Sequence, residues 1–385
     1  MATHETGRRA LLRALAVAVP AGAAVSLTGC LDGNDARAAT ADPGPEPGGQ
    51  AAQPWQSFAT VEEAGFSKAS IDSLEAALYP LETTSLMIVR HGKIAYRYGN
   101  IDDVAYLASA RKSILSMLYG KYVEDGTIDL DKTMGDLGID DNAGLLPIEK
   151  TAKIRHVLTA TSGVYHPAGS PGGSANTPER GSVTPGTQFL YNNWDFNVAG
   201  AIFEKLTGRT IFDAFAKELA EPLGMEDFDP SRQRMLGYKT NASRYLAYHF
   251  FLSARDMARL GVLMANKGNW NGRQIVPASW VADSTSLHVP MSQIAGERDC
   301  GYGYLWWLPS ESRSAVEWQG SFLANGNYGQ FILVLPNIDT VIVHRRSVTD
   351  EFAVARNLGN TDVNKAGVNA NAFLKLVDGA LVGHV

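Results

Sequence analysis

Residues 85–98 read Ser-Leu-Met-Ile-Val-Arg-His-Gly-Lys-Ile-Ala-Tyr-Arg-Tyr, and this stretch decides the class of fold. Ser85 to Val89 is an apolar run of strand length, and Lys93 to Tyr98 is a second strand. The His91-Gly92 pair between them is typical of a tight hairpin turn. An antiparallel hairpin this early in the chain argues against a doubly wound parallel sheet, which would place a helix between consecutive strands.

Helical and strand patterns follow this hairpin in separate blocks. Apolar residues at helical spacing predict helices at 108–124, 152–160, 194–207 and 211–220. Ser253 and Asp256 resemble a capping box that opens a helix reaching Lys267, and a helix from Asn371 to Leu381 closes the chain. Strands are predicted at Tyr302–Leu308, Ala315–Trp318, Gln330–Leu335 and Thr340–His344.

The order of these blocks predicts an α/β (α+β) fold. An antiparallel sheet flanked by helices would be built from both ends of the folded part, residues 56–106 and 245–385, with an all-helical domain, 107–244, inserted between them. Residues 163–187 are rich in Gly, Pro, Ser and Thr. They predict a long loop, which in a compact domain is usually functional.

Composition narrows the class of protein. The 385 residues are 45 % hydrophobic and 19 % charged with a formal net charge of -6, which excludes a disordered or fibrous chain. The folded part has no basic block, so we expect no nucleic-acid partner. Two cysteines cannot build a disulfide framework, and no histidines stand at metal-ligand spacing. We therefore expect neither a metal nor a cofactor.

The N-terminal residues predict export. Basic residues Arg8, Arg9 and Arg13 precede an apolar stretch at 14–28, and Leu27-Thr28-Gly29-Cys30 resembles a lipobox. We expect a lipoprotein signal peptide at 1–30, lipid on Cys30 and a flexible tether at 31–55, giving an exported, membrane-anchored lipoprotein. A secretory signal cut later, near residues 36–41, is the alternative, and the oligomeric state stays open.

Ser109-Ala110-Arg111-Lys112 is the first candidate for chemistry. Ser109 and Lys112 are one helical turn apart near a helix N-terminus, where a desolvated lysine can take the serine proton and backbone N–H groups favour an oxyanion. A serine three residues before a lysine also occurs roughly once by chance in a chain of this length, so the pair alone is weak.

Two further stretches are candidates. Tyr191 could act as a general base beside a lysine, and Asn193 could donate its amide to a substrate carbonyl or orient the lysine. The alternative is that Asn192 or Asn193 caps the following helix and Tyr191 belongs to the core. A second Tyr-x-Asn, Tyr98-Gly99-Asn100, shows how common the pattern is. Residues 326–330, Gly-Asn-Tyr-Gly-Gln, could supply an oxyanion N–H or be a plain hairpin turn.

Together these boxes resemble the serine β-lactamase and penicillin-recognising superfamily, in the branch of class C β-lactamases, family VIII esterases and 6-aminohexanoate-dimer hydrolases. The surroundings are similar too, over about residues 56–350, including 126–131 (Gly-Thr-Ile-Asp-Leu-Asp), 161–164 (Thr-Ser-Gly-Val) and 256–261 (Asp-Met-Ala-Arg-Leu-Gly). The resemblance implies a β-lactamase/transpeptidase-like fold with a serine nucleophile.

By position, the resemblance implies Ser109 as nucleophile, Lys112 as its base partner and Tyr191 as the second base or acid. Asn193 matches the motif's asparagine. The oxyanion would lie between the N–H groups of Ser109 and Asn327, next to Gly326. The family's third box, Lys-Thr-Gly, is absent from both the Trp318 and the Gly326 regions, although an arginine such as Arg345 or Arg346 could replace its lysine.

An ester or small linear amide is therefore expected as substrate rather than a β-lactam. A β-lactamase or D,D-peptidase, and an inactive binding lipoprotein, stay open as alternatives. Arg90-His91-Gly92 only superficially resembles a histidine phosphatase motif, and the nucleophile elbow of α/β-hydrolases is absent. Candidates for a pocket lining, with ordinary packing as the alternative, are Tyr165, His166, Trp194, Trp306, Trp307 and Trp318.

Overall fold

The computed structural model describes residues 54–170, 177–296, 299–357 and 368–381. The chain divides into two units, 1–46 and 47–385, and only the second contains described residues. The predicted signal peptide, Cys30 and nearly all of the predicted tether lie outside them. None of the helices in the described ranges is both long and apolar enough to cross a membrane.

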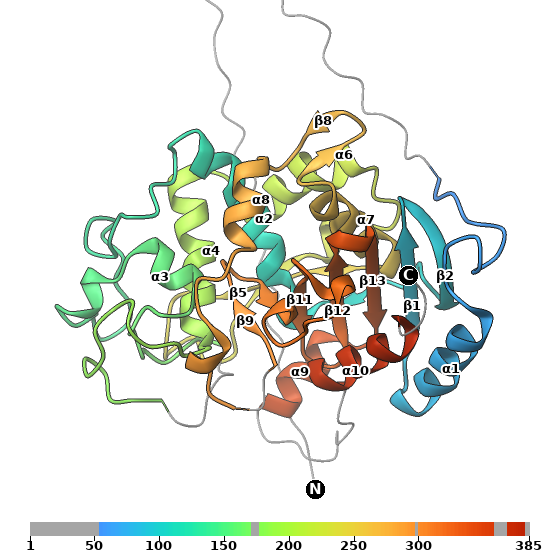
Figure 1. Cartoon of the computed structure of the whole chain (residues 1–385). Helices are drawn as coiled ribbons and strands as arrows, with labels where there is room; N and C mark the ends of the chain where they lie inside the picture. Colours follow the sequence, from blue (N-terminus) through green and yellow to red (C-terminus); the bar gives the residue numbers. More distant parts are fainter. Residues whose placement is uncertain (1–53, 171–176, 297–298, 358–367, 382–385) are drawn as a thin grey trace, which may run out of the picture. The chain divides into compact units, whose positions relative to one another are not determined.

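A seven-stranded antiparallel sheet forms the centre of the fold (Figure 1). Its order is β2-β1-β13-β12-β11-β10-β9, and every neighbouring pair is antiparallel. The strands are β1 (Ser85–Arg90), β2 (Lys93–Gly99), β9 (Gly301–Tyr302), β10 (Trp307–Leu308), β11 (Phe322–Gly326), β12 (Gln330–Leu335) and β13 (Thr340–Arg345). The predicted fold class is therefore confirmed.

Three two-stranded sheets accompany it. They pair β3 (Ala105–Tyr106) with β6 (Phe251–Leu252), β4 (Arg234–Leu236) with β5 (Ala247–His249), and β7 (Asn269–Trp270) with β8 (Arg273–Gln274). The helices are α1 (Lys68–Leu78), α2 (Arg111–Glu124), α3 (Ile154–Leu158), α4 (Asn193–Thr207), α5 (Ile211–Phe215), α6 (Glu221–Leu223), α7 (Ala254–Ala265), α8 (Ala278–Ser284), α9 (Asp350–Asn357) and α10 (Ala370–Leu381).

The opening hairpin follows the sequence prediction closely. His91 and Gly92 both have positive φ, 49° and 70°, between β1 and β2. Two left-handed residues in a two-residue loop match the right-handed twist of the flanking strands. The turn therefore favours direct antiparallel pairing of β1 with β2, and β1 then pairs with β13 from the other end of the chain.

Helices cover both faces of the sheet, which explains why all six residues of β12 are buried. On one face Phe373 of α10 stacks on Phe331 of β12, with 4.6 Å between ring centroids. On the other face α7 packs against β12 and β13. Gly261 of α7 lies so close that a Cβ there would come within 2.4 Å of Val341 Cγ1. Phe331 and the next residue, Ile332, thus face opposite layers, as the strand period of two requires.

The middle of the chain, from α2 through α6, holds helices joined by long loops, and its described residues add no strand to the large sheet. The predicted helix at 194–207 is confirmed, and Gly208 ends it with φ 69°. The predicted helix at 152–160 is shorter, and the one at 211–220 is α5 followed by a π-helical turn, Ala216–Ala220. The residues of the seven-stranded sheet all lie within 85–99 and 301–345. The proposed boundaries of the helical insertion remain a prediction, and the short strand β4 lies inside them.

Two predicted strands are wrong in detail. Tyr302–Leu308 is interrupted, because the Ser113 and Ser116 hydroxyls of α2 donate to the carbonyls of Leu305 and Tyr304, each at 2.7 Å. Leu305 adopts φ 65° there, so the segment leaves the sheet between β9 and β10. Ala315–Trp318 is not a strand, since Val316–Trp318 forms a 3₁₀ turn, and the strand that precedes the Gly326 turn is β11.

The predicted capping box at Ser253 is half correct. Ser253 Oγ accepts a hydrogen bond from the Asp256 N–H at 3.2 Å, and α7 ends at Ala265, two residues before Lys267. The Asp256 carboxylate does not return the bond to Ser253. It accepts instead from the N–H groups of Glu226 and Asp227, at 2.9 and 3.0 Å.

Candidate active site

Ser109 lies in a strained turn directly before a helix. The short strand β3 leads into a 3₁₀ turn, Ala108–Ala110, and α2 begins at Arg111. Ala108 has φ 48°, a left-handed conformation that costs energy for a residue with a Cβ and is concentrated at functional sites. The turn leaves Ser109 half-buried at the N-terminus of α2, where the helix dipole favours negative charge.

Lys112 connects the predicted site residues. Its side chain is buried, and Nζ donates to Ser109 Oγ at 3.1 Å, to Tyr191 OH at 2.8 Å and to Asn193 Oδ1 at 3.0 Å. An ammonium group has three N–H donors, and each has an acceptor here. Nζ also lies 4.0 Å from the ring centroid of Phe196, which compensates part of the lost solvation.

Tyr191 and Asn193 flank the N-cap of α4, so the capping reading is confirmed for Asn192, while the proton-transfer role of Tyr191 remains a prediction. Asn192 is the N-cap, and its Oδ1 accepts from the Asp195 N–H at 3.1 Å. Asn193, the first residue of the helix, turns its amide oxygen to Lys112 and donates through Nδ2 to Ser170 O at 3.0 Å. The Tyr191 ring packs against Phe196, with 4.5 Å between centroids. The second Tyr-x-Asn, at residue 98, is at the end of β2 and does not line the site.

The 326–330 stretch is a hairpin turn that also approaches the serine. β11 ends at Gly326 and β12 begins at Gln330, so the turn reading is confirmed. A Cβ on Gly326 would lie 2.4 Å from Leu107 O and 2.9 Å from Ala110 N. Only glycine therefore lets β11 lie this close to the turn that carries Ser109. Asn327 follows at the edge of the same cavity, and its role as oxyanion donor remains a prediction.

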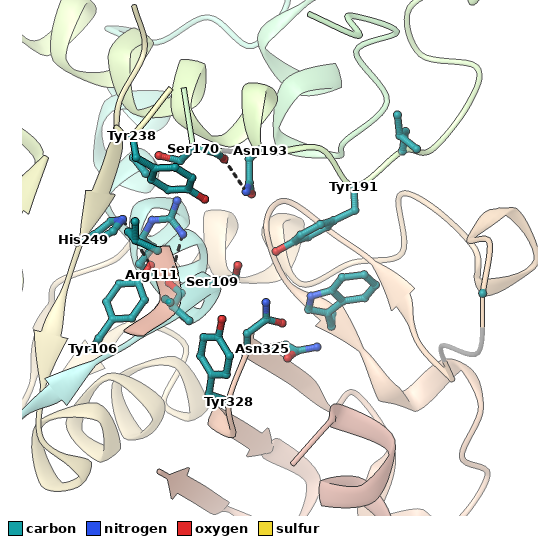
Figure 2. A pocket seen from close by; sticks show the side chains of 18 of the residues that line it. Tyr106, Ser109, Arg111, Ser170, Tyr191, Asn193, Tyr238, His249, Asn325 and Tyr328 are labelled. Atoms are coloured by element: carbon teal, nitrogen blue, oxygen red, sulfur yellow. Dashed lines mark hydrogen bonds between the residues drawn. The ribbon is translucent and has the colours of Figure 1, made fainter. Parts of the chain in front are cut away.

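These residues open onto a cavity of about 610 Å³ (Figure 2). Ser109, Tyr191, Asn193 and Asn327 line it, whereas Lys112 lies behind them and Gly326 supports the wall. Of the four tryptophans considered for a pocket, only Trp307 lines this cavity. His166 lies instead against an earlier segment of the chain, with Nε2 2.6 Å from Asn142 O. Tyr165 is also absent from the lining.

Neither arginine considered as a substitute for the missing lysine reaches the cavity. Arg345, the last residue of β13, is buried and donates through Nε to Gln330 Oε1 at 2.7 Å, and burial lowers its pKa to about 10. Arg346 pairs with Glu82. The carboxylate-binding cation of the β-lactamases thus has no counterpart at either position.

One wall of the cavity consists of residues that were not predicted from the sequence. Figure 2 shows Arg111, Tyr106, Tyr238 and His249 on the side of Ser109 that faces away from Tyr191. His249 Nδ1 lies 3.0 Å from Asp350 Oδ2, and burial lowers the pKa of the imidazole, which favours its neutral form. Arg111 lies inside the Ser-x-x-Lys box, and this position was the only sequence feature that could have indicated a residue of this wall. His249 had none, because Ser109 and its own partner Asp350 are both far from it in sequence.

No three His, Cys, Asp or Glu side chains lie together as metal ligands within the described parts of the chain. The arrangement instead offers an oxygen nucleophile, two proton-transfer groups and a helix N-terminus around one cavity. These are the groups that acyl transfer through a serine requires.

The chain belongs to the Beta-lactamase family, whose model matches residues 71–344. Among solved structures it is similar to a Bacillus anthracis protein named as a candidate 6-aminohexanoate-dimer hydrolase. That match has a TM-score of 0.61 and 19 % identity, and covers 87 % of each chain. It is also similar to EstCE1, a hydrolase with promiscuous acyltransferase activity (TM-score 0.54, 17 % identity, 79 % of this chain and 99 % of that one).

A curated relative is the lovastatin esterase of Penicillium rubens, which is 27 % identical over 161 residues. The match spans 33 % of this chain and 39 % of that enzyme. The predicted superfamily is confirmed, and the protein is an enzyme of the serine hydrolase type on a β-lactamase fold.

Proposed function

We propose that this protein hydrolyses carboxylic esters, and small linear amides more slowly, through an acyl-enzyme on Ser109. One observation carries the proposal. The buried Lys112 ammonium lies within hydrogen-bond distance of both Ser109 Oγ and Tyr191 OH, so a proton can pass between nucleophile and acid without crossing solvent. The esterase among the relatives supports the same substrate class.

The reaction follows from this geometry. Ser109 Oγ attacks the carbonyl carbon, and its proton passes through the Lys112 ammonium to Tyr191, which starts this step as the phenolate and ends it as the hydroxyl. The Tyr191 hydroxyl then gives a proton to the departing oxygen or nitrogen as its bond to the carbonyl carbon breaks. Water attacks the acyl-enzyme, delivers its proton through the same pair, and releases the acid with the Ser109 hydroxyl restored. Backbone N–H groups of Ser109 and Asn327 stabilise the oxyanion in both steps.

The test is covalent labelling. A fluorophosphonate should form one adduct, which peptide mass spectrometry places on Ser109, and Ser109→Ala should lose both the adduct and ester turnover. Ser73→Ala, on the exposed face of α1, is the matched serine control and should behave like the wild type. Labelling that survives Ser109→Ala would place the nucleophile at another residue. An unlabelled and inactive wild type would favour the inactive binding protein instead.

The substrate class has its own prediction. A β-lactam must have its carboxylate held on the leaving-group side, and the Ala324-Asn325-Gly326 end of β11 supplies no cation there. Losing one charge-assisted hydrogen bond costs about 1.5–3 kcal/mol, roughly ten- to a hundredfold in binding. We expect kcat/KM for p-nitrophenyl butyrate to exceed that for nitrocefin by at least this factor. Comparable turnover of the two would favour the β-lactamase alternative.

A further inference from the structure

We propose that Arg111 is an anion-binding subsite for the far end of the acyl group, so that preferred substrates carry a carboxylate on the acyl chain. The inference rests on the proposed function and specifies its substrate. The cavity has two sides. Tyr191 lies on one side of Ser109, and Arg111, Tyr238 and His249 lie on the other (Figure 2).

The direction of the substrate follows from the proton path. Tyr191 gives its proton to the leaving group, so the leaving group lies on the Tyr191 side of the scissile carbonyl. The acyl chain must then extend to the opposite side, toward Arg111. A cation at this position would bind the acyl portion of the substrate. The lysine of the family's Lys-Thr-Gly box, which this chain lacks, would instead bind the leaving-group portion.

Arg111 is a buried cation without an acidic partner. Arg111 is only 4 % exposed, and its guanidinium makes no ion pair with any described carboxylate. Nη1 donates to Ala108 O at 3.2 Å, the guanidinium carbon lies 4.9 Å from the Tyr248 ring centroid, and Nε has no hydrogen-bond partner. A guanidinium has five N–H donors, so this environment leaves most of its capacity for a planar anion.

The surroundings do not supply that anion. Among the described residues that line the cavity, Arg111 is the one that carries a full charge at neutral pH, and none is Asp or Glu. The carboxylate behind this wall, Asp350, is already engaged by His249 Nδ1 at 3.0 Å and by Arg234 Nε at 2.8 Å. Burial would raise the pKa of Asp350, but these hydrogen bonds hold it well below its usual range.

The cavity is thus positively charged and open beside the nucleophile. A buried cation gains most when an incoming carboxylate accepts its free N–H groups, because both charges are then paired away from water. A volume of about 610 Å³ also falls within the range of small-molecule sites, which leaves room for a chain of several carbons between the carbonyl and the carboxylate.

The experiment compares two substrates that differ only in this charge. They are the mono-p-nitrophenyl ester of adipic acid and the p-nitrophenyl ester of adipic acid monoamide, each corrected for spontaneous hydrolysis. The wild type should prefer the carboxylate ester in kcat/KM by about ten- to a hundredfold, the value of a charge-assisted hydrogen bond. Arg111→Gln should remove most of this preference.

The readout is the ratio of the two kcat/KM values, in which the concentration of folded enzyme cancels. Partial unfolding of the Arg111→Gln variant therefore cannot imitate the expected result. Arg97→Gln, an exposed arginine on β2, is the matched control and should keep the wild-type ratio.

Two outcomes would overturn the inference. The wild type would show no preference for the carboxylate ester, or Arg111→Gln would slow both substrates by the same factor, which is what a role restricted to holding the Ala108 carbonyl predicts. If the neutral ester is still cleaved through Ser109 in these cases, only the acyl-side subsite fails. If neither ester is cleaved by the wild type, the proposed function fails as well.

Discussion

Lys112 shows how one side chain organises the site. A lysine buried among aromatic rings is costly unless all three of its protons are bonded. Here the three acceptors come from the turn before α2 and from two residues that flank the N-cap of α4. The same bonds that make the burial tolerable place the lysine between the proposed nucleophile and the proposed acid.

Tyr191→Phe tests the acid directly. The substitution deletes only the phenol oxygen, and the ring contacts with Phe196 and Trp307 should persist. If Tyr191 transfers the proton to the leaving group, kcat for p-nitrophenyl butyrate should fall about 10²–10⁴-fold. Circular dichroism and the Tm must be recorded alongside, because a folded variant that keeps more than half the rate would make Tyr191 a packing residue.

Site residues that belong to short motifs could be predicted from the sequence, whereas residues that come together only in the folded structure could not. Ser109, Lys112, Tyr191 and Asn193 are brought together as predicted. His249 was not foreseen, because it lines the cavity from β5 and its partner Asp350 comes from the start of α9. Nothing in a local pattern indicates which buried histidine will face a cavity.

At the scale of elements, the approach of β11 to the serine turn sets the shape of the site. Antiparallel pairing with β12 fixes β11, and Gly326 at its end meets backbone atoms of Leu107 and Ala110. Backbone cannot move aside as a flexible side chain can. The spacing between strand and turn therefore depends on the missing Cβ.

Gly326→Ala should disturb this spacing. The new Cβ would lie 2.4 Å from Leu107 O, so the β11 end or the Ser109 turn must shift by a fraction of an ångström to an ångström. Small misplacements of reacting groups cost as much as a hundredfold in rate, and we expect kcat to fall by about ten- to a hundredfold.

Gly379→Ala is the matched control for this variant. Gly379 lies in α10, and a Cβ added there would have no atom within 4 Å, so the rate and Tm of this variant should stay close to those of the wild type. A Gly326→Ala enzyme with the full wild-type rate would show that the close approach has no part in catalysis.

Element prediction succeeded where burial on both faces or a local turn signal dominates. β12 and β13 are continuous apolar runs that helices cover from both sides, and the β1–β2 hairpin has its turn residues in place. The 302–308 stretch has similar composition but loses its middle to hydrogen bonds from Ser113 and Ser116 of α2. That competition comes from a helix almost 200 positions earlier and leaves no trace in the local pattern.

At the scale of the whole molecule, α7 joins the sheet to the segment that ends the helical region. α7 packs on β12 and β13, while its first turn binds the residues after α6. Asp256 is the centre of this junction, because its two oxygens accept the N–H groups of Glu226 and Asp227. Arg259 adds an ion pair to Glu226 at 2.8 Å. A substitution that weakens this junction should therefore lower the free energy of global unfolding.

The charge of Asp256 makes this effect depend on pH. Burial raises its pKa to about 6 in the folded state, against an ordinary value of 3.8. The folded protein thus binds the proton more tightly than the unfolded chain. The resulting stabilisation is fully present below about pH 4 and is lost as the pH rises through about 6. A pKa difference of about two corresponds to about 3 kcal/mol, which is large beside a typical free energy of unfolding.

Asp256→Asn removes this titration, and the measurement is urea unfolding of both proteins between pH 4.5 and 7.5. The variant loses one acceptor for a backbone N–H at every pH, which lowers its free energy of unfolding by a constant amount. The wild type should gain stability relative to the variant as the pH falls from 7 to 4.5, by about 2 kcal/mol. Asp229→Asn is the control, because hydrogen bonds with Ser231 lower the pKa of that exposed carboxyl and its contribution should have the opposite slope. A difference between wild type and Asp256→Asn that stays flat, or grows as the pH rises, would mean that the two backbone N–H groups hold Asp256 ionised despite its burial.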